Sequence, residues 1–247
     1  MTKLILLGTA GFHPNERRHT ACLMLPELGI VLDAGTAMFR VRDHLCTSRL
    51  DIFLSHAHLD HVVGLTFLLD VLYGKQIDPV TLYGAAEKLA AIDRHLLAKE
   101  IFPVALPCNY EALTGPVELP GGPRVTHFPL SHPGGTLGFR LSWPDRAMAY
   151  VTDTTASADA EYLEQIRGVD LLVHECNFPD SMSELAAVTG HSCLTPVLEL
   201  ARAANVKRLV LTHLNPLADS DEFLGLEQAR HIFPAVETGW DGMEIEF

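Results

Sequence analysis

Four potential metal ligands fall within six consecutive residues of this chain: His56, His58, Asp60 and His61. Imidazole and carboxylate groups are typical protein ligands of divalent metal ions. His56 and His58 are two residues apart, so in an extended loop they point the same way and can bind one ion. Asp60 and His61 then turn toward a second ion. The alternative is chance clustering in a chain with 13 histidines among 247 residues, which a match at all four positions makes weak.

The residues on either side of this run predict the elements that position it. Residues 51–54 are mostly apolar and include β-branched and aromatic side chains, which predicts a buried strand. Gly64 and the largely apolar residues 65–69 predict the start of a helix. Open α/β sheets bind ligands beyond the carboxyl ends of their strands, so a corner of strand, loop and helix suits a metal site.

Three further candidate residues also follow predicted strands. His132 comes after residues 125–130, Asp153 after 147–152, and His213 after 206–212. A single histidine in a turn is weak evidence for a metal, and an aspartate at a strand end is commonly a helix cap. The residue types alone therefore leave the roles of these three side chains open.

Residues 56–61 resemble the HxHxDH signature of the metallo-β-lactamase superfamily. The resemblance implies an α/β fold, the αββα sandwich of two mixed β-sheets flanked by helices, with two metal ions at one edge of the sheets. Other segments resemble its ribonuclease Z-like, or phosphodiesterase, branch: LGT at 7–9, HECNF at 174–178 (similar to HEATF), GHS at 190–192 and VKRLVLTH at 206–213. The similarity covers nearly the whole chain and predicts one hydrolase domain over residues 1–247.

The resemblance also implies a dinuclear metal centre with seven protein ligands. It assigns His56, His58 and His132 to one ion and Asp60, His61 and His213 to the other. Asp153 and a hydroxide then bridge the two ions. Zinc is the expected metal for such a histidine-rich set, with manganese or iron as alternatives.

Glu175 and His191 form a pair that the resemblance places beside the metals. A carboxylate that orients an imidazole keeps it able to protonate a leaving oxygen, so both residues are predicted to be catalytic. Asp60 is predicted to be catalytic as well, because it can orient the attacking hydroxide. The alternative for Glu175 is that it is buried and only holds His191 in place.

Several other polar residues lie near these motifs. Asp33 follows an apolar run and precedes Ala34-Gly35, so it either supports the metal site or forms a turn. His127 and His174 are predicted to be structural. Arg17 and Arg18 could contact a phosphate, but we expect a solvated loop there.

The composition is that of an ordinary globular domain, with 48% hydrophobic and 20% charged residues. A net charge of −13 argues against a large nucleic-acid surface, since Lys and Arg must neutralise phosphates there. The N-terminal apolar run, residues 4–7, is too short for a signal peptide or a membrane span, so we expect a cytoplasmic protein. The five cysteines form no CxxC pair and are predicted to be small core residues.

Three functions fit these patterns. We favour a metal-dependent phosphodiesterase acting on a small substrate, such as a cyclic nucleotide, a cyclic phosphate or an oligonucleotide end. The second function is tRNA 3′ processing by a ribonuclease Z. That family grips tRNA with a basic, glycine-rich arm inserted between the segments matched by His132 and Asp153, and here only residues 133–152 lie between them. The third function is a non-phosphate hydrolase, such as a thioesterase, a lactonase or a β-lactam-like amide hydrolase, and the Glu175 and His191 match argues against it. The resemblance also implies a homodimer.

One short helix at residues 159–166 and three longer helices are predicted outside the central motif. Residues 85–99 place Leu89, Ile92 and Leu96 on one face. Residues 194–204 carry Pro196 in the first turn, where proline is tolerated. A third helix around residues 222–233 precedes a final strand at 242–247.

Overall fold

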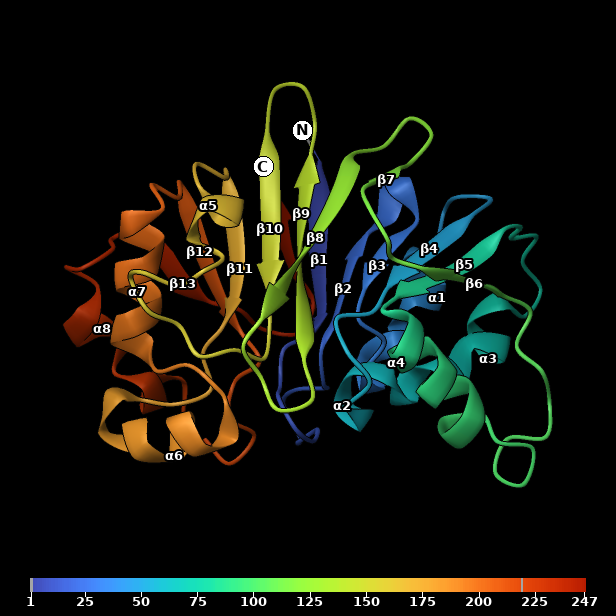
Figure 1. The fold of residues 1–247 in the computed structure, drawn as a ribbon, viewed down its shortest axis with the longest axis horizontal. Coiled ribbons are helices and arrows are strands. Elements are labelled where there is room, and N and C mark those ends of the chain that lie inside the picture. The colour runs from blue at the N-terminus through green and yellow to red at the C-terminus, as the bar shows by residue number, and fades with distance from the viewer. Residues whose placement is uncertain (1, 219) are drawn as a thin grey trace. The chain divides into compact units, whose positions relative to one another are not determined.

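Each of two units of the chain is built around one seven-stranded mixed β-sheet (Figure 1). The computed structural model describes residues 2–218 and 220–247. Unit 1 comprises the chain as far as Gly115 together with Trp240–Phe247, and unit 2 comprises Pro116–Gly239. All strands of a sheet belong to the same unit, so each unit has its own sheet and its own hydrophobic core.

The sheet of unit 1 has the strand order β14-β1-β2-β3-β4-β5-β6. Neighbouring strands are antiparallel from β14 to β3 and parallel from β3 to β6. The carboxyl ends of β3 and β4 therefore lie side by side, and Asp33 follows the first directly while His56 comes shortly after the second. The bounds are β1 Lys3–Gly8, β2 Cys22–Leu25, β3 Ile30–Leu32, β4 Leu50–Phe53, β5 Val80–Gly84, β6 Asn109–Ala112 and β14 Met243–Glu246.

Short helices cover one face of this sheet. Buried side chains of β3, β4 and β5 pack with Met38, Leu65 and Leu89 in one cluster. A glycine allows the chain after the histidine motif to approach the loop that follows β3. A Cβ on Gly64 would lie only 2.1 Å from the carbonyl oxygen of Gly35. The helices are α1 Val41–His44, α2 Leu59–Val62, α3 Leu68–Leu72 and α4 Ala86–Ala91, with 3₁₀ turns at Pro26–Leu28, Thr36–Arg40 and Val63–Phe67 and a π turn at Ile92–Leu96.

The sheet of unit 2 has the strand order β13-β12-β11-β10-β9-β8-β7. Its strands are parallel from β13 to β10 and antiparallel from β10 to β7. Asp153 lies two residues beyond β10, Glu175 ends β11 and His213 follows β12, so three parallel strands deliver polar residues at the same edge. The bounds are β7 Val117–Glu118, β8 Arg124–Leu130, β9 Thr136–Ser142, β10 Ala147–Val151, β11 Leu171–Glu175, β12 Arg208–Thr212 and β13 Val236–Thr238.

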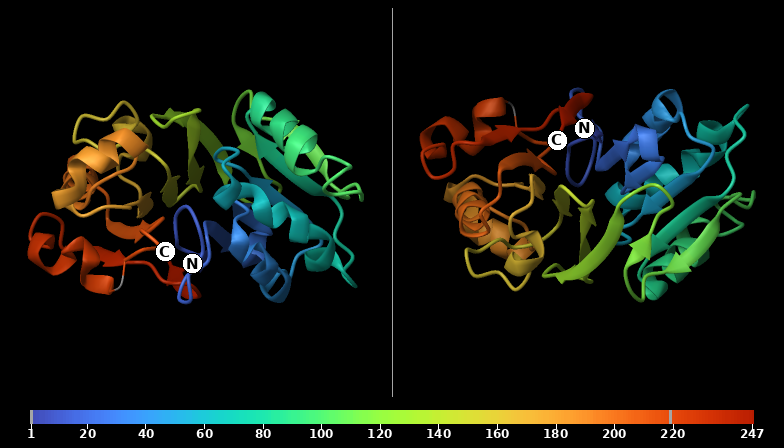
Figure 2. Two further views of the ribbon diagram at one scale, coloured as in Figure 1. Left: turned by 90° about the horizontal axis from the view of Figure 1, so that it is seen from below. Right: turned by 90° about the horizontal axis from the view of Figure 1, so that it is seen from above.

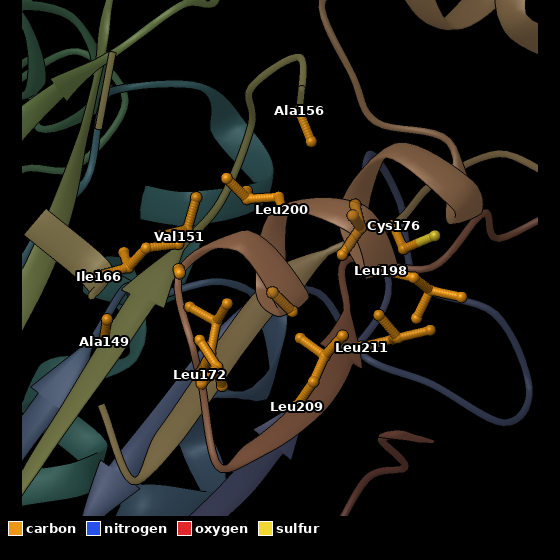
Figure 3. Packing of buried hydrophobic residues seen from close by; sticks show 14 of the residues in the cluster. Ala149, Val151, Ala156, Ile166, Leu172, Cys176, Leu198, Leu200, Leu209 and Leu211 are labelled. Carbon is orange, nitrogen blue, oxygen red and sulfur yellow. The ribbon is translucent and has the colours of Figure 1, made fainter. Parts of the chain in front are cut away.

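The core of unit 2 lies between this sheet and its helices. Leu198 and Leu200 of one helix pack with Val151, Leu172 and Leu209 of the parallel strands (Figure 3). In both views of Figure 2 the helix α7, drawn in orange, lies beside the strands of its own unit. The helices are α5 Leu163–Ile166, α6 Ser183–Thr189, α7 Leu194–Ala203 and α8 Leu226–Ala229, with 3₁₀ turns at Asp180–Met182 and Asp221–Leu224.

The predicted elements agree well with the structure except at three helices. The helix expected to start at Gly64 is a 3₁₀ turn at Val63–Phe67 that leads into α3, and the short α2 precedes it from Leu59. The helix expected over residues 194–204 and the strand before the histidine motif are confirmed. The helix expected over 85–99 is α only as far as Ala91 and then widens into the π turn. The helix expected around 222–233 is wrong in extent, because Gly225 has a left-handed backbone (φ 72°) that separates a 3₁₀ turn from the four-residue α8.

No helix among the residues that the structure describes is both long and apolar enough to cross a membrane.

Candidate metal centre

In unit 1 the four residues of the central motif form a compact cluster. The ring centroid of His56 lies 4.4 Å from that of His58 and 4.3 Å from that of His61. His56 and His61 are buried, whereas His58 is exposed and precedes the first residue of α2. The three imidazoles of this run therefore lie side by side within unit 1.

The buried carboxylate of Asp33 organises this cluster from behind. Its Oδ1 accepts a hydrogen bond from the backbone N–H of Ser55 (2.8 Å), and its Oδ2 accepts one from the Ser55 hydroxyl (2.9 Å). Oδ2 also lies 2.8 Å from Nδ1 of His61, which must carry a proton to donate to a carboxylate. Asp33 is fully buried, so these donors replace the water that the carboxylate loses. The structure favours the supporting role for Asp33 over the turn-forming role.

These hydrogen bonds fix which nitrogen of each ring is available for a metal. The single hydroxyl proton of Ser55 goes to Asp33, so the Ser55 oxygen accepts from Nδ1 of His56 at 2.9 Å. In a neutral imidazole with a proton on Nδ1, Nε2 has the free electron pair. His56 and His61 thus both present Nε2, the arrangement in which an outer hydrogen-bond partner orients a metal ligand.

Asp60 is held in place by the loop that follows β1. Its Oδ2 accepts a hydrogen bond from the backbone N–H of Phe12 (2.8 Å) and lies 3.4 Å from Nε2 of His61. Both of these facing atoms carry electron pairs, because the proton of His61 is on Nδ1. Two electron-pair donors at this distance repel each other unless a cation lies between them.

In unit 2 the side chain of Asp153 stands between two histidines. Its Oδ2 lies 3.5 Å from Nε2 of His132, and its Oδ1 lies 3.2 Å from Nε2 of His213. All three side chains are almost completely buried. One carboxylate therefore offers a different oxygen to each histidine, as a bridging ligand requires.

Nε2 of His132 faces a carboxylate oxygen in the same way as Nε2 of His61 does. Its Nδ1 lies 2.9 Å from the carbonyl oxygen of Gly190, which can only accept, so the ring proton is on Nδ1. Burial lowers the pKa of His132 and outweighs the opposing effect of Asp153, so the ring is neutral near pH 7. Gly190 must be glycine here, because its φ is 74° and a Cβ would lie 2.5 Å from Cδ of Pro133. Nε2 of His132 and Oδ2 of Asp153 thus face each other with two electron pairs.

The predicted pair of Glu175 and His191 is in contact. Oε1 of Glu175 lies 3.0 Å from Nδ1 of His191 and also accepts from the backbone N–H of Thr154 (2.9 Å). Oε2 accepts from the backbone N–H of Ser192 (3.2 Å). Glu175 is fully buried, and the ring of His191 is stacked on that of His213 with centroids 5.2 Å apart. A buried carboxylate thus orients an imidazole that also touches a candidate ligand.

Three residues of these clusters have a left-handed backbone although they are not glycine. The φ angles are 59° at Asp33, 46° at Asp153 and 51° at His213. Each residue follows closely after a strand of a parallel sheet region, where the turn redirects the side chain. Non-glycine residues in this conformation store strain, and such strain gathers at functional sites.

The donor atoms in both units fit divalent metal ions. In unit 2, Asp153, His191 and His213 each offer one ligand atom, and these atoms lie within 4.8 Å of one another. In each unit a carboxylate oxygen faces an imidazole nitrogen whose proton is on the other side of its ring. Histidine nitrogen and carboxylate oxygen together match zinc, with manganese and iron also compatible.

Other polar residues discussed from the sequence lie outside these clusters. His174 is buried, with Nε2 accepting from the hydroxyl of Tyr162 (2.9 Å) and Nδ1 donating to the carbonyl oxygen of Glu175 (2.7 Å), which confirms its structural role. The expectation of a solvated Arg18 is wrong, because this side chain is buried and donates to the hydroxyl of Thr9 at 2.8 Å.

Sequence reasoning missed two supporting residues. Ser55 directly precedes the histidine motif, and its hydroxyl links Asp33 to His56. The side-chain amide of Asn177 donates to the carbonyl oxygen of His213 (3.0 Å) and supports the left-handed turn there. The available signal is the position of Asn177 in the segment HECNF, two residues after Glu175.

Comparison with known proteins agrees with this site. A model of the β-lactamase superfamily domain matches residues 29–214. A ribonuclease Z of Salinibacter ruber is 30% identical over 295 residues, covering 95% of this chain and 91% of the relative.

Two solved structures have the same fold over nearly their full lengths. The metallo-β-lactamase fold protein YhfI of Bacillus subtilis has a TM-score of 0.80 at 20% identity, with complete coverage of both chains. The short form of human tRNase Z has a TM-score of 0.74 at 22% identity, covering 99% of this chain and 98% of that one.

The chain belongs to the metallo-β-lactamase superfamily, and its fold is the one that the HxHxDH resemblance predicted. Within that superfamily its similarity is to the ribonuclease Z-like branch, which confirms the prediction from the segments at 174–178 and 206–213. The protein is a metal-dependent hydrolase of this family.

Proposed function

We propose that this protein is a phosphodiesterase that uses two divalent metal ions, most simply zinc, to hydrolyse a small phosphodiester. The observation that carries the proposal is the short path between His132 and Asp153. After a turn at residues 132–135, that path consists of β9, a tight turn in which Trp143 donates to the carbonyl oxygen of Arg146 (2.9 Å), and β10. Residues 133–152 thus form a turn and two connected strands and contain no inserted arm that would grip a large RNA.

The proposed ligand set is the one predicted from the sequence. His56, His58 and His132 hold one ion, Asp60, His61 and His213 hold the other, and Asp153 bridges them. The electron pairs that face each other at Asp60 and His61, and at Asp153 and His132, support these assignments. When bound, the ions would lower the pKa of a shared water and neutralise charge on the phosphoryl oxygens.

The protein's own residues supply the remaining chemistry in this proposal. Asp60, fixed by the N–H of Phe12, orients the attacking water. Glu175 keeps Nδ1 of His191 protonated and thereby directs Nε2 of the same ring toward the leaving oxygen. When the bond from phosphorus to that oxygen breaks, the oxygen keeps the electron pair and takes the proton from Nε2.

A ribonuclease Z is the second candidate, because the Salinibacter ruber relative carries that name. The alignment spans 295 positions although this chain has only 247 residues, so the relative has segments that this chain lacks. The net charge of −13 is a further reason to prefer a small substrate. A non-phosphate hydrolase is the third candidate, and the resemblance of the Glu175 and His191 pair to that of the ribonuclease Z-like branch argues against it.

Four substrates assayed side by side test the proposal. Metal-loaded protein is given bis(p-nitrophenyl) phosphate, a precursor tRNA, a thioester and a lactone, with Asp153→Ala as the blank. We expect hydrolysis of the phosphodiester without cleavage of the tRNA. Accurate cleavage of the tRNA would establish the second candidate instead. Turnover confined to the thioester or lactone would overturn the phosphate chemistry and leave the metal site intact.

We also propose a homodimer, which the family resemblance implies. Size-exclusion chromatography with light scattering gives the mass directly, and a value near the 27.1 kDa of one chain would contradict the proposal.

A further inference from the structure

A cavity of about 420 Å³ opens beside His191 within unit 2. Its walls come from the loop after β10, from α6 and from the start of α7, so it lies entirely in one unit. The volume falls in the range of sites that bind small molecules, roughly 300–1,000 Å³. His191 lines the cavity, whereas Asp153 does not.

The cavity wall is mainly apolar, and its one basic side chain is that of His191 at the edge toward Glu175. Ala156, Ala186 and Cys193 are nearly buried and line it together with Pro196. Burial raises the pKa of the Cys193 thiol to about 11, so this side chain is neutral near pH 7. The lining residues include neither lysine nor arginine. Such a wall suits an uncharged organic group and does not suit a phosphate.

Asp180, the one acidic residue of the wall, further disfavours a phosphate in the cavity. The carboxylate oxygens of Asp180 accept hydrogen bonds from the backbone N–H of Thr195 (2.9 Å) and from its hydroxyl (2.6 Å). These neutral donors leave the negative charge in place. An anionic group in the cavity would be repelled, so the phosphoryl group must stay outside it.

His191 connects the cavity to the cluster around Asp153. Its ring lies 5.0 Å from that of His132 and 5.2 Å from that of His213, measured between centroids. The same ring lines the cavity, and Glu175 holds its Nδ1. A group bonded to an oxygen that takes a proton from His191 has this cavity directly beside it.

We propose that the cavity binds the organic group that leaves with the departing oxygen, and that this group is uncharged and of the size of an aryl ring or a nucleobase. The inference rests on the proposed phosphodiesterase function and adds the class of leaving group. The oxygen of the attacking water forms a bond to phosphorus, and the bond from phosphorus to the leaving oxygen breaks. The leaving oxygen keeps that electron pair and takes the proton from His191, and the resulting alcohol or phenol occupies the cavity until it is released.

Two variants of α6 test the cavity directly. Ala187 is exposed and lines the cavity, so Ala187→Trp fills it from the rim without disturbing the core. Val188, the next residue of the same helix, is 80% exposed and is not part of the lining, so Val188→Trp adds the same bulk outside the cavity. Thermal unfolding of both variants verifies that they fold as the wild type does.

Two substrates separate the leaving group from the rest of the reaction. Methyl p-nitrophenyl phosphate and methyl 2,2,2-trifluoroethyl phosphate share the retained methyl group and differ only in the group that departs. In Ala187→Trp we expect kcat/KM for the nitrophenyl ester to fall by at least about tenfold, as for loss of a hydrophobic pocket. The trifluoroethyl ester should be hydrolysed as by the wild type, and Val188→Trp should leave both rates unchanged.

Unchanged hydrolysis of the nitrophenyl ester by Ala187→Trp would overturn the inference. An equal loss on both esters would also overturn it, because the variant would then act on the whole site rather than on the leaving group. Failure of the wild type to hydrolyse either ester is a different result. It would contradict the phosphodiesterase function itself, and the leaving-group pocket would fall with it.

Discussion

The two clusters of candidate ligands are built in different ways. In unit 1 the histidines come from one short run of sequence, and a single buried carboxylate, Asp33, orients His61 directly and His56 through Ser55. In unit 2 the side chains follow separate strands, and backbone groups help to orient them. The carbonyl oxygen of Gly190, for example, holds His132.

This difference separates two roles that a carboxylate can have. Asp153 faces two imidazole nitrogens and fits the role of a ligand, whereas Asp33 faces the protonated side of His61 and fits the role of a support. Both residues have the same left-handed backbone, which asparagine also tolerates. Replacing each with asparagine therefore changes the charge and leaves the turn in place.

The largest expected effect belongs to Asp153→Asn. The amide cannot give an anionic oxygen to each neighbour, so hydrolysis of bis(p-nitrophenyl) phosphate should fall by more than the 10- to 100-fold typical of supporting residues. Bound metal per chain, measured by elemental analysis, should fall as well. A folded Asp153→Asn protein with full metal content and near wild-type activity would remove Asp153 from the ligand set.

Asp33→Asn should have a smaller effect, and on metal affinity first. Its NH₂ group would take the place either of Oδ2, where it meets the Ser55 hydroxyl and the N–H of His61, or of Oδ1, where it meets the backbone N–H of Ser55. All of these groups are donors, so affinity should drop by about 10- to 100-fold. The matched control is Asp51→Asn, which also removes a buried carboxylate of unit 1 but one that is paired with Arg49 (2.7 Å). The control should lose stability and keep its metal affinity, and equal metal loss in both variants would refute the supporting role of Asp33.

The same difference explains how much the sequence could predict. The cluster of unit 1 was visible because its ligands occupy alternating or adjacent positions, from His56 to His61, that already fix their mutual distances. In unit 2 the spacing between His132, Asp153 and His213 is set by strand order and by helices between the strands. Only the resemblance of whole segments to a known family made those residues candidates.

The sequence could not predict the supporting contacts, for a further reason. The hydroxyl of Ser55 and the carbonyl oxygen of Gly190 act through positions that depend on backbone turns rather than on residue type. Serine and glycine are so common that neither draws attention in a sequence. The burial of Arg18 could not be predicted either, because the hydroxyl it pairs with, on Thr9, belongs to the preceding strand end.

Glu175→Gln tests whether the carboxylate of Glu175 acts on the protonation of His191 or only holds the structure of unit 2. Glutamine keeps the shape of the side chain and can still accept from Thr154, but it removes the charge that favours a protonated His191. We expect kcat to fall about tenfold, a part of the 10²- to 10⁴-fold that a general acid contributes. Metal content and KM should stay unchanged, and the alkaline limb of the pH profile of kcat should move to lower pH. Loss of metal with an unchanged pH profile would mean that Glu175 only holds the structure.

His174 is a buried histidine of unit 2 that lies outside the cluster of candidate ligands. It should make the free energy of unfolding depend on pH. Burial lowers its pKa from the ordinary 6.5, so the folded protein keeps the ring neutral while the unfolded chain takes up a proton. The free energy of unfolding should therefore decrease as the pH falls below about 6.5, by at most about 1.4 kcal/mol per pH unit from this residue. Denaturant titrations at pH 7.5 and 5.5 should show a smaller decrease for His174→Gln than for the wild type. An equal decrease would show that His174 does not contribute.

The smallest effect is expected at Phe12, whose N–H holds Asp60 in unit 1. Its backbone is left-handed (φ 61°) and its side chain is 79% exposed, so Phe12→Gly relieves backbone strain and loses little burial. Strain relief of about 1–2 kcal/mol is offset by about 0.5–1 kcal/mol of extra chain entropy in the unfolded state, which leaves a net gain of up to about 1.5 kcal/mol. Phe39→Gly is the control, because Phe39 lies in a 3₁₀ turn and is 44% exposed, and there glycine should destabilise. Opposite shifts in the midpoint of urea unfolding, with unchanged metal affinity in Phe12→Gly, would show that the N–H of residue 12, and not its side chain, supports the cluster. Destabilisation of both variants would mean that the aromatic ring of Phe12 contributes to the fold.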